Sequence, residues 1–402
     1  MTRRSLRRAA WQLHRWLGIA AFSVLALVGA TGALLAFEDE IVQALNRDVR
    51  TVEPRASGRL PLPELLAKVQ EQAPAERLSA VELAGDPRAA VRVTLESPAD
   101  DGDRPRRASR YADPYTGRLD ARAGERGEEF FREVRTLHRW LVVGPIGSRD
   151  VGREIVALCA IALVLLGLSG LWVRWPRTRT QWRTWLKLDL RARGRTRLSN
   201  PHVVLGAWAF PIYLVIALTG LSWSYPSYRD ALESLAGVNR PEPTRESRRA
   251  AAERPRAPAT RPLSAAAWSA LLATADTADI GHVSLRLPTS EGEPIRMRYL
   301  GADPAHSRAF DVVSIDPATL RILERTPYAA QPLAARLVTS RFALHSGSYF
   351  GLPGRLLFTL ASLALPVVAV TGALLWLRTL GSRKRARDTT RASARRRSDA
   401  LV

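Results

Sequence analysis

The chain has 402 residues, a net charge of +22 and one cysteine, Cys159. The length allows two or three domains. One cysteine excludes disulfides within the chain, iron–sulfur clusters held by four thiolates and the paired-cysteine attachment of c-type haem. A charge of +22 would indicate a nucleic-acid partner if the basic excess were spread evenly along the chain, but nearly all of that excess falls in three short segments, and the two long loops are nearly balanced in charge.

Four stretches of the sequence are almost purely apolar. A helix of about twenty residues rises ~1.5 Å per residue and so crosses the ~30 Å hydrocarbon core of a bilayer. Backbone groups find no water there, so each stretch has to be helical. We therefore predict a membrane α-helical fold in a lipid bilayer, with spans at Trp16–Phe37, Ile155–Trp175, Val203–Tyr225 and Arg355–Leu377.

The basic segments flank these spans. Residues 1–15 contain no acid, and the stretch 174–197 contains only Asp189; a third basic segment follows the fourth span. Because basic residues stay on the cytoplasmic side of a membrane, both termini and the middle segment are expected there, with the two long loops in the periplasm of a bacterial inner membrane. The charge then serves the anionic lipid surface, and no nucleic acid is expected as a partner.

The two halves of the chain have the same order of features. Every span ends in a [Ser/Thr]-Gly pair, and each long loop has a helix-like segment, three strand-like runs and an Asp-Pro turn. We predict an internal duplication in which each half is a span, an α+β domain and a span. The expected helices are Leu62–Gln72 and Leu263–Thr274; the expected strands are Leu78–Leu83, Ala90–Leu95 and Ala108–Tyr111, then Ile280–Leu287, Pro294–Tyr299 and Ala309–Ile315; Pro241–Pro262 is expected to be a flexible linker.

We expect the protein to act on the outer side of the membrane, because the cytoplasmic segments are too short to hold a domain and carry no dinucleotide-binding or P-loop motif. The predicted segments are a cytoplasmic N-terminus with the first transmembrane helix (1–37), a periplasmic α+β domain (38–154), the second transmembrane helix (155–175), a basic cytoplasmic loop (176–202), the third transmembrane helix (203–225), a second periplasmic α+β domain (226–354), the fourth transmembrane helix (355–378) and a basic cytoplasmic tail (379–402).

Four of the six histidines stand at the ends of the spans. His14 and His202 open the first and third spans at the predicted cytoplasmic end, whereas His138 and His345 precede the second and fourth at the outer end. The two halves thus supply one pair for each leaflet, which is what two bis-imidazole haems require. A zinc or copper site would need all its ligands in one shell. With methionine only at positions 1 and 297, we predict two haem b groups, held without covalent attachment.

Glycines share a helix face with two of these histidines. A glycine four residues after a histidine lies beside it, and one eighteen residues after lies about five turns, or ~27 Å, further along the same face. Both positions would give clearance to a macrocycle, although bare helix packing also favours glycine. The residues concerned are Gly18 and Gly32 after His14, and Gly206 and Gly220 after His202.

The remaining candidate residues have two interpretations each. Arg15 and Arg139 directly follow a histidine and could pair with haem propionates or anchor the chain at the membrane interface. His282 and His306 fall in the second long loop, where a solvated surface histidine is the default and contact with a substrate near the outer haem is the alternative.

The order of these features resembles the PepSY-associated transmembrane helix family, which includes inner-membrane ferrisiderophore reductases. The resemblance runs from about residue 10 to 378 and rests on the four spans, their [Ser/Thr]-Gly ends, the Leu-His-Arg-Trp-Leu segments at 13–17 and 137–141, and the Asp-Pro-x-Thr turns at 113–116 and 316–319. It implies haem ligation by His14 and His202 inside and by His138 and His345 outside, with PepSY-like folds for the outer domains. The second turn departs from the first, with Leu320 in place of Gly117.

The expected function is transmembrane electron transfer through the two haems. The acceptor would be a ferric siderophore or another periplasmic oxidant, and the donor a cytoplasmic or quinol reductant, which makes the protein a haem-dependent ferric-chelate reductase. Two alternatives stay open. One is a non-enzymatic PepSY membrane module that binds or regulates a periplasmic peptide or protein, with structural histidines. The other is a quinol-linked cytochrome subunit that serves another periplasmic reductase.

Overall fold

The computed structural model describes residues 2–97, 106–142, 147–176, 178–189, 191–238, 280–288, 293–301 and 303–399. The chain forms two compact units. The helical unit comprises Met1–Phe37, Phe131–Asp230 and Leu344–Val402, and the sheet unit comprises Glu38–Phe130 and Ala231–Ala343.

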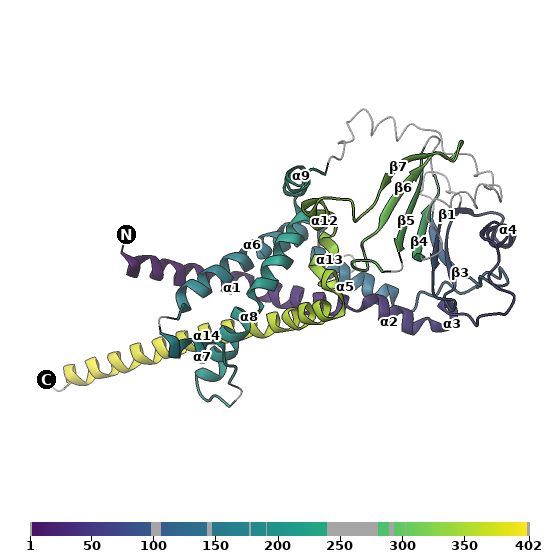
Figure 1. Cartoon of the computed structure of the whole chain (residues 1–402). Helices are drawn as coiled ribbons and strands as arrows, with labels where there is room; N and C mark the ends of the chain where they lie inside the picture. The colour runs from purple at the N-terminus through teal and green to yellow at the C-terminus, as the bar shows by residue number, and fades with distance from the viewer. Residues whose placement is uncertain are drawn as a thin grey trace. The chain divides into compact units, whose positions relative to one another are not determined.

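Four long helices make up most of the helical unit: α1 (Arg3–Leu35), α6 (Arg149–Arg174), α8 (Thr196–Ser224) and α14 (Gly351–Asp399). Helix α1 contacts α6 and α14, and α8 contacts the same two helices, so the four close into a bundle (Figure 1). Each contains a segment long and apolar enough to cross a membrane, namely Arg4–Leu35, Arg149–Arg174, Thr196–Ser224 and Ser348–Gly381. The predicted four-helix membrane fold is confirmed, and each helix begins before its predicted apolar stretch.

Short helices lead into the long ones. Helix α5 (Glu128–Trp140) precedes α6, whereas α13 (Arg341–Ser346) and a 3₁₀ turn (Ser348–Phe350) precede α14. Directly after α5 the chain turns at Leu141, which has a φ of 52°, in the left-handed region. Residues 143–146, which follow this turn, lie outside the described part of the chain. The other short helices are α2 (Glu38–Leu45), α3 (Arg47–Arg50), α7 (Arg179–Leu186), α9 (Pro226–Leu235) and α12 (Leu333–Thr339).

Small residues let the long helices approach closely in the middle of the bundle. A Cβ at Gly29 of α1 would lie 2.8 Å from the carbonyl oxygen of Ser362 in α14. The Tyr213 hydroxyl of α8 donates to the carbonyl oxygen of Ala361 in α14 at 2.9 Å. This bond satisfies the polar atom of a buried side chain. Close backbone contact of this kind is the usual packing of membrane helices. The buried core here consists of Ala21, Leu25, Ala162, Ala209, Tyr213, Ala361 and Leu365.

The sheet unit contains one seven-stranded antiparallel sheet of order β3-β2-β1-β4-β5-β6-β7. Helix α4 (Leu62–Gln72) covers one face of it (Figure 1), and Leu65 and Val69 of α4 pack with Val81, Leu285 and other inward side chains of the strands. Buried residues alternate with less buried ones along β1, β2 and β5, as a sheet with one buried face requires. The strands are β1 (Arg77–Ala84), β2 (Val91–Glu96), β3 (Arg107–Ala112), β4 (Ile280–Arg286), β5 (Ile295–Gly301), β6 (Asp311–Ile315) and β7 (Ile322–Thr326).

The two long loops share this sheet instead of forming a separate sheet each, which corrects the predicted arrangement. Strand β1 from the first loop pairs antiparallel with β4 from the second, from Ala80 opposite Arg286 to Ala84 opposite His282. Each loop would otherwise leave one strand edge unpaired, and joining the two edges removes that liability. The six strands that the sequence predicts are all present, whereas β7 was not predicted because nearly all its residues are exposed and no alternation marks it.

The two Asp-Pro turns have the same backbone geometry despite their sequence difference. The Gly117 N–H donates to the Asp113 carbonyl at 2.9 Å, and the Leu320 N–H donates to the Asp316 carbonyl at 2.9 Å. Gly117 has a φ of 75° and Leu320 a φ of 57°. A left-handed leucine costs roughly 1–2 kcal/mol, and its packing against the core offsets part of this cost. The predicted helix at 263–274 and linker at 241–262 lie outside the described residues.

Candidate functional site

The four histidines at the ends of the spans meet in two pairs. The ring centroids of His14 on α1 and His202 on α8 are 6.1 Å apart, with the planes at 90°. Those of His138 on α5 and His345 on α13 are 6.4 Å apart, with the planes at 77°. Each pair combines one histidine from each half of the chain. Thr31, which contacts His138, comes 17 residues after His14, or roughly 26 Å along α1, so the pairs lie at opposite ends of the bundle.

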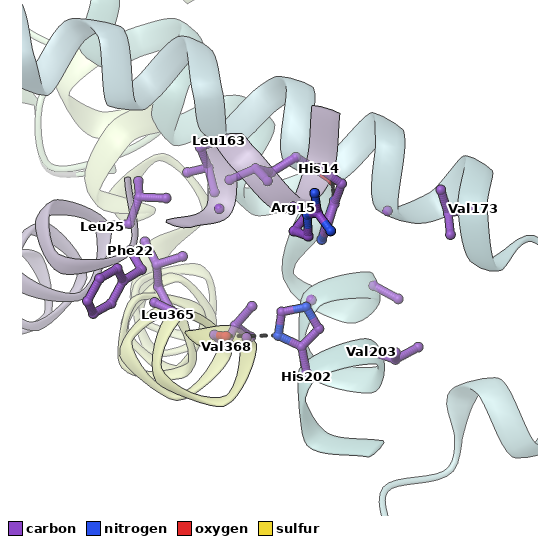
Figure 2. A pocket seen from close by; sticks show the side chains of 18 of the residues that line it. His14, Arg15, Phe22, Leu25, Leu163, Val173, His202, Val203, Leu365 and Val368 are labelled. Atoms are coloured by element: carbon purple, nitrogen blue, oxygen red, sulfur yellow. Dashed lines mark hydrogen bonds between the residues drawn. The ribbon is translucent and has the colours of Figure 1, made fainter. Parts of the chain in front are cut away.

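Both rings of the first pair are held by a neighbouring helix. His14 Nδ1 is 3.0 Å from the Leu166 carbonyl oxygen and 3.1 Å from Ser169 Oγ, both on α6. His202 Nδ1 is 2.8 Å from the Val368 carbonyl oxygen and 3.4 Å from Thr371 Oγ1, both on α14. Figure 2 shows His202 with its bond to Val368, and His14 with Arg15 across the cavity.

The second pair repeats this arrangement. His138 Nδ1 is 3.0 Å from Thr31 Oγ1 on α1, and His345 Nδ1 is 3.0 Å from Thr219 Oγ1 and 3.1 Å from the Ile216 carbonyl oxygen, both on α8. Burial lowers the pKa of both His138 and His345 to about 4, so both imidazoles are neutral at pH 7. The ring of Trp223 lies edge-on to His345, with centroids 5.2 Å apart.

The hydrogen bonds determine which ring nitrogen is available. A carbonyl oxygen can only accept, so Nδ1 carries the proton. Each hydroxyl also presents a lone pair to the ring, because its own proton is donated back along its helix, as Ser169 does to the Leu165 carbonyl at 2.6 Å; Thr31, Thr219 and Thr371 do the same. In all four histidines Nε2 is left with the lone pair, and none of these Nε2 atoms has a hydrogen-bond partner within the described chain.

The glycine of each [Ser/Thr]-Gly pair makes room for a histidine ring. A Cβ at Gly372 would lie 2.8 Å from His202 Cε1, and one at Gly170 would lie 3.1 Å from His14 Cε1. At the other end the corresponding distances are 3.1 Å from Gly32 to His138 Cε1 and 3.5 Å from Gly220 to His345 Cε1. The four repeated dipeptides are therefore four seats, each holding one imidazole by a hydrogen bond beside a missing side chain.

The predicted glycines divide into two groups. Gly18 and Gly206 line the cavity next to His14 and His202, and a Cβ at either would have its nearest neighbour at 3.7 or 3.8 Å. These are ordinary van der Waals distances, and the clearance predicted for a macrocycle stays a prediction. Gly32 and Gly220 contact the rings of the second pair directly, so their role differs from the prediction: they accommodate the imidazole itself.

A cavity of about 200 Å³ adjoins the first pair. Its wall is mostly apolar, with Phe22, Leu25 and Leu365 on one side (Figure 2) and Tyr213 among the further lining residues. Two guanidinium groups, Arg15 and Arg174, also line it, and no aspartate or glutamate does so among the described residues. The cavity is thus suited to a largely apolar group with an anionic edge.

The two predicted arginines are placed differently. Arg15 lines the cavity, and its guanidinium carbon lies 4.8 Å from the Trp11 ring centroid and 4.9 Å from that of Trp16. Arg139 is exposed and lies 4.6 Å from the Trp140 ring centroid. The structure therefore brings Arg15 to the cavity, whereas the contacts of Arg139 are those of an interfacial side chain.

The histidines of the second loop lie in the sheet unit. The default prediction of a solvated surface residue is wrong for His306, which is 6% exposed. Its Nε2 lies 2.9 Å from the Tyr328 hydroxyl and 3.1 Å from Ser340 Oγ, so a buried hydrogen-bond network explains its position. His282 is partly buried, with its ring centroid 6.2 Å from that of Phe310.

The spacing of both pairs fits one metal ion between two imidazoles. Metal–imidazole bonds of about 2 Å put two ligating nitrogens roughly 4 Å apart, and the ring centres roughly 6 Å apart. The observed separations are 6.1 and 6.4 Å. Among the described residues, no three His, Cys, Asp or Glu side chains converge, whereas a structural zinc site needs four ligands. Two neutral imidazoles with free Nε2 atoms are the donor set of a bis-histidine haem.

The residues that hold the histidines were not predicted as part of the site, although their signal was in the sequence. The [Ser/Thr]-Gly pairs mark the span ends, but which pair faces which histidine depends on how the four helices pack. Trp185, which also lines the cavity, lies in a segment whose composition suggests only a basic surface. The residues missed are Thr31, Ser169, Gly170, Trp185, Thr219, Thr371 and Gly372.

Comparison with curated proteins gives no match. The family model for the PepSY-associated TM region matches residues 11–379, which is nearly the whole chain. This range includes most of α1 and α14, all of α6 and α8, the shared sheet and all four paired histidines. The chain is therefore a membrane protein that belongs to the PepSY-associated TM family.

Proposed function

We propose that the protein carries electrons across a bacterial inner membrane through two haem b groups, one at each histidine pair. The observation that carries this proposal is the meeting of His14 with His202 and of His138 with His345, at 6.1 and 6.4 Å between ring centroids, at opposite ends of one bundle. Haem, when bound, supplies reversible one-electron chemistry at its iron.

The chain's own residues would determine how the groups are held and tuned. The Nδ1 hydrogen bonds orient each imidazole and increase its basicity as a ligand. The apolar wall of the cavity keeps water from the first site, which favours the less charged state of a bound metal centre. The missing side chains of Gly18 and Gly206, which line the cavity, would leave more room for the group beside His14 and His202.

The direction of transfer follows from the distribution of basic residues. We place both termini and the 176–202 loop in the cytoplasm, because these segments hold the basic excess. The His14–His202 pair then lies at the cytoplasmic end and the His138–His345 pair at the periplasmic end. An internal duplication would account for the matching order of the strands from the two loops. It would also account for the matching hydrogen bonds of the histidines in the two halves.

The acceptor that we propose is a ferric siderophore in the periplasm. Each ferric ion takes one electron, and the ferrous ion that results is held more weakly by hard oxygen ligands and is released. The donor would be a cytoplasmic or quinol reductant. Basic side chains near the outer pair would favour the approach of acidic chelates.

The test is a single-turnover reaction of the purified full chain. Haem-loaded protein is reduced, freed of excess reductant and mixed with a ferric hydroxamate or catecholate chelate, while a ferrous-specific dye traps the product. We expect one ferrous ion for each electron held, with loss of reaction in His138→Ala and normal reaction in Cys159→Ala, a matched change within the bundle. Reduced protein that stays reduced in the presence of every chelate would contradict the proposed acceptor and leave electron transfer to another partner.

A PepSY membrane module that binds or regulates a periplasmic partner is the alternative from a different class. A reduced-minus-oxidised spectrum separates the two, because the regulator needs no haem. Absence of a b-type signal from protein produced with an ample haem supply would favour the regulator. A b-type signal with electron delivery only to a separate reductase would favour the quinol-linked cytochrome subunit.

A further inference from the structure

The cavity beside His14 and His202 contains two polar atoms that no described residue satisfies. The indole Nε1 of Trp185 and the guanidinium Nε of Arg15 are both buried, and neither has a hydrogen-bond partner within the part of the chain that the structure describes. Both residues line the cavity. Since buried donors are nearly always paired, two unpaired donors in one cavity wall indicate a ligand that accepts from both.

The charge around these donors specifies the kind of acceptor. Arg15 and Arg174 both line the cavity, and its described lining contains no carboxylate. Arg15 donates through Nη2 to the neutral Gln12 side chain at 2.7 Å, and no ion pair neutralises it among the described residues. The missing acceptor is therefore anionic, and a planar carboxylate matches an indole N–H together with a guanidinium N–H.

Trp185 has a second tryptophan beside it that does not line the cavity. It belongs to α7, between α6 and α8, and its ring centroid lies 5.4 Å from that of Trp182, which lies 5.7 Å from that of Trp175. Trp182 is not among the residues that line the cavity. The two tryptophans are therefore neighbours of the same type, of which only Trp185 reaches the site.

We propose that Trp185 Nε1 and Arg15 Nε bind a carboxylate on the edge of the group that His14 and His202 hold. This inference rests on the proposed function, under which that group is haem b and the carboxylate is a propionate. Trp185 is then a positioning residue. The imidazoles would hold the group at its metal, and the two N–H groups would orient it through its carboxylate. Helix α7 becomes part of the cofactor site through this one side chain.

The experiment compares haem b with its dimethyl ester, in which both carboxylates are neutral. The full chain is prepared with His138→Ala, so that only the cavity site is occupied, and each compound is titrated by absorbance. The titration is repeated with Trp185→Phe and with Trp182→Phe as the matched control. A hydrogen bond to a charged group is worth about tenfold or more in affinity. We expect the unsubstituted site to prefer haem over the ester, Trp185→Phe to lose about tenfold of that preference, and Trp182→Phe to keep it.

The outcomes separate this inference from the function on which it rests. No haem binding by the unsubstituted chain would contradict the proposed function. Normal haem binding with no preference over the ester would overturn only the carboxylate site. A loss of affinity in Trp185→Phe that is equal for haem and ester would also overturn it, because the indole would then serve packing alone. The comparison of haem with its ester in the His138→Ala chain, with both tryptophans intact, needs no change at Trp185, so a folding defect in Trp185→Phe leaves the proposal testable.

Discussion

The chain holds four histidine rings in the same way, each with Nδ1 bonded to a neighbouring helix and Nε2 left with its lone pair, which is the state that a metal ligand needs. A hydroxyl and a glycine that are adjacent in sequence flank each ring, and the hydroxyl is itself oriented by the carbonyl four residues earlier on its helix. The ring then keeps its Nδ1 proton, and Nε2 faces away from the seat. Second-shell contacts of this kind usually change metal affinity by about 10–100-fold when removed.

The first prediction at this scale concerns the tightest of the four seats. In Gly372→Ala the new Cβ would lie 2.8 Å from His202 Cε1, so the ring has to shift. We expect about a 10- to 100-fold loss of haem affinity at the His14–His202 site, measured by haem titration. Gly381→Ala on the same helix is the control, because a Cβ there meets nothing within 4 Å. Equal affinities in the two variants would show that the seat does not position the ligand.

The second prediction concerns the hydroxyl that accepts from His138. Thr31→Val keeps the shape of the side chain and removes an acceptor 3.0 Å from Nδ1. The ligand becomes less basic, so the midpoint potential of that site should rise by an amount on the order of tens of millivolts. Potentiometric titration measures it. Thr359→Val is the control, since that hydroxyl bonds only within α14; a similar shift there would mean a general packing effect.

The pairing of the histidines was predictable from sequence because symmetry carries the information: two similar halves, each with one histidine at either end of the bundle. Their seats were not predictable. The Thr31–His138 contact joins residues 107 positions apart, and nothing local in either segment specifies it. Arg15 and Arg139 show the same limit, because the two copies of Leu-His-Arg-Trp-Leu place their arginines in different surroundings.

At the scale of elements, the shared sheet shows what periodicity can and cannot predict. Alternating apolar residues predicted the six strands. The helix-like pattern predicted the helix Leu62–Gln72 with the observed bounds. The β1–β4 pairing joins strands about 200 residues apart in sequence, and edge pairing depends on which strands meet in space. The same inward-facing residues would be buried in one shared sheet or in two separate sheets. The alternation therefore does not predict which of the two arrangements forms.

The third prediction tests whether the joined sheet has one core. Leu285 of β4 is 0% exposed and packs among residues from both loops, whereas Leu323 of β7 is 61% exposed. Leu285→Ala should destabilise the sheet unit by about 2–5 kcal/mol, and Leu323→Ala by less than about 0.5 kcal/mol. The measurement is pulse proteolysis of the full chain across a urea series. Cleavage that responds only within strands of the second loop would argue for two independent cores.

At the scale of the whole molecule, the main feature is that the chain keeps its excess positive charge outside its long apolar helices. Four helices are long and apolar enough to cross a membrane, and the excess of basic over acidic residues falls in the two terminal segments and the short segment between the second and third helices. Composition alone predicted this arrangement, because the cost of burying charge in hydrocarbon leaves few alternatives.

The fourth prediction fixes the orientation. In a Cys159→Ala background, a single cysteine is placed at the exposed Ser57 or at the exposed Thr196. A membrane-impermeant maleimide added to spheroplasts should label Ser57→Cys and leave Thr196→Cys unlabelled until the membrane is opened. The reverse pattern would put the His14–His202 pair at the periplasmic end and exchange the roles of the two sites.

The most direct measurement of the whole account is the number of haem groups per chain in purified protein. We predict two b-type haems in the unsubstituted chain. We predict one in His14→Ala, one in His138→Ala and none in the double variant, with two retained in His306→Ala, whose ring lies in a buried network of the sheet unit. Two haems retained in the double variant, or none in the unsubstituted chain under ample haem supply, would contradict the claim that the paired imidazoles are the ligands.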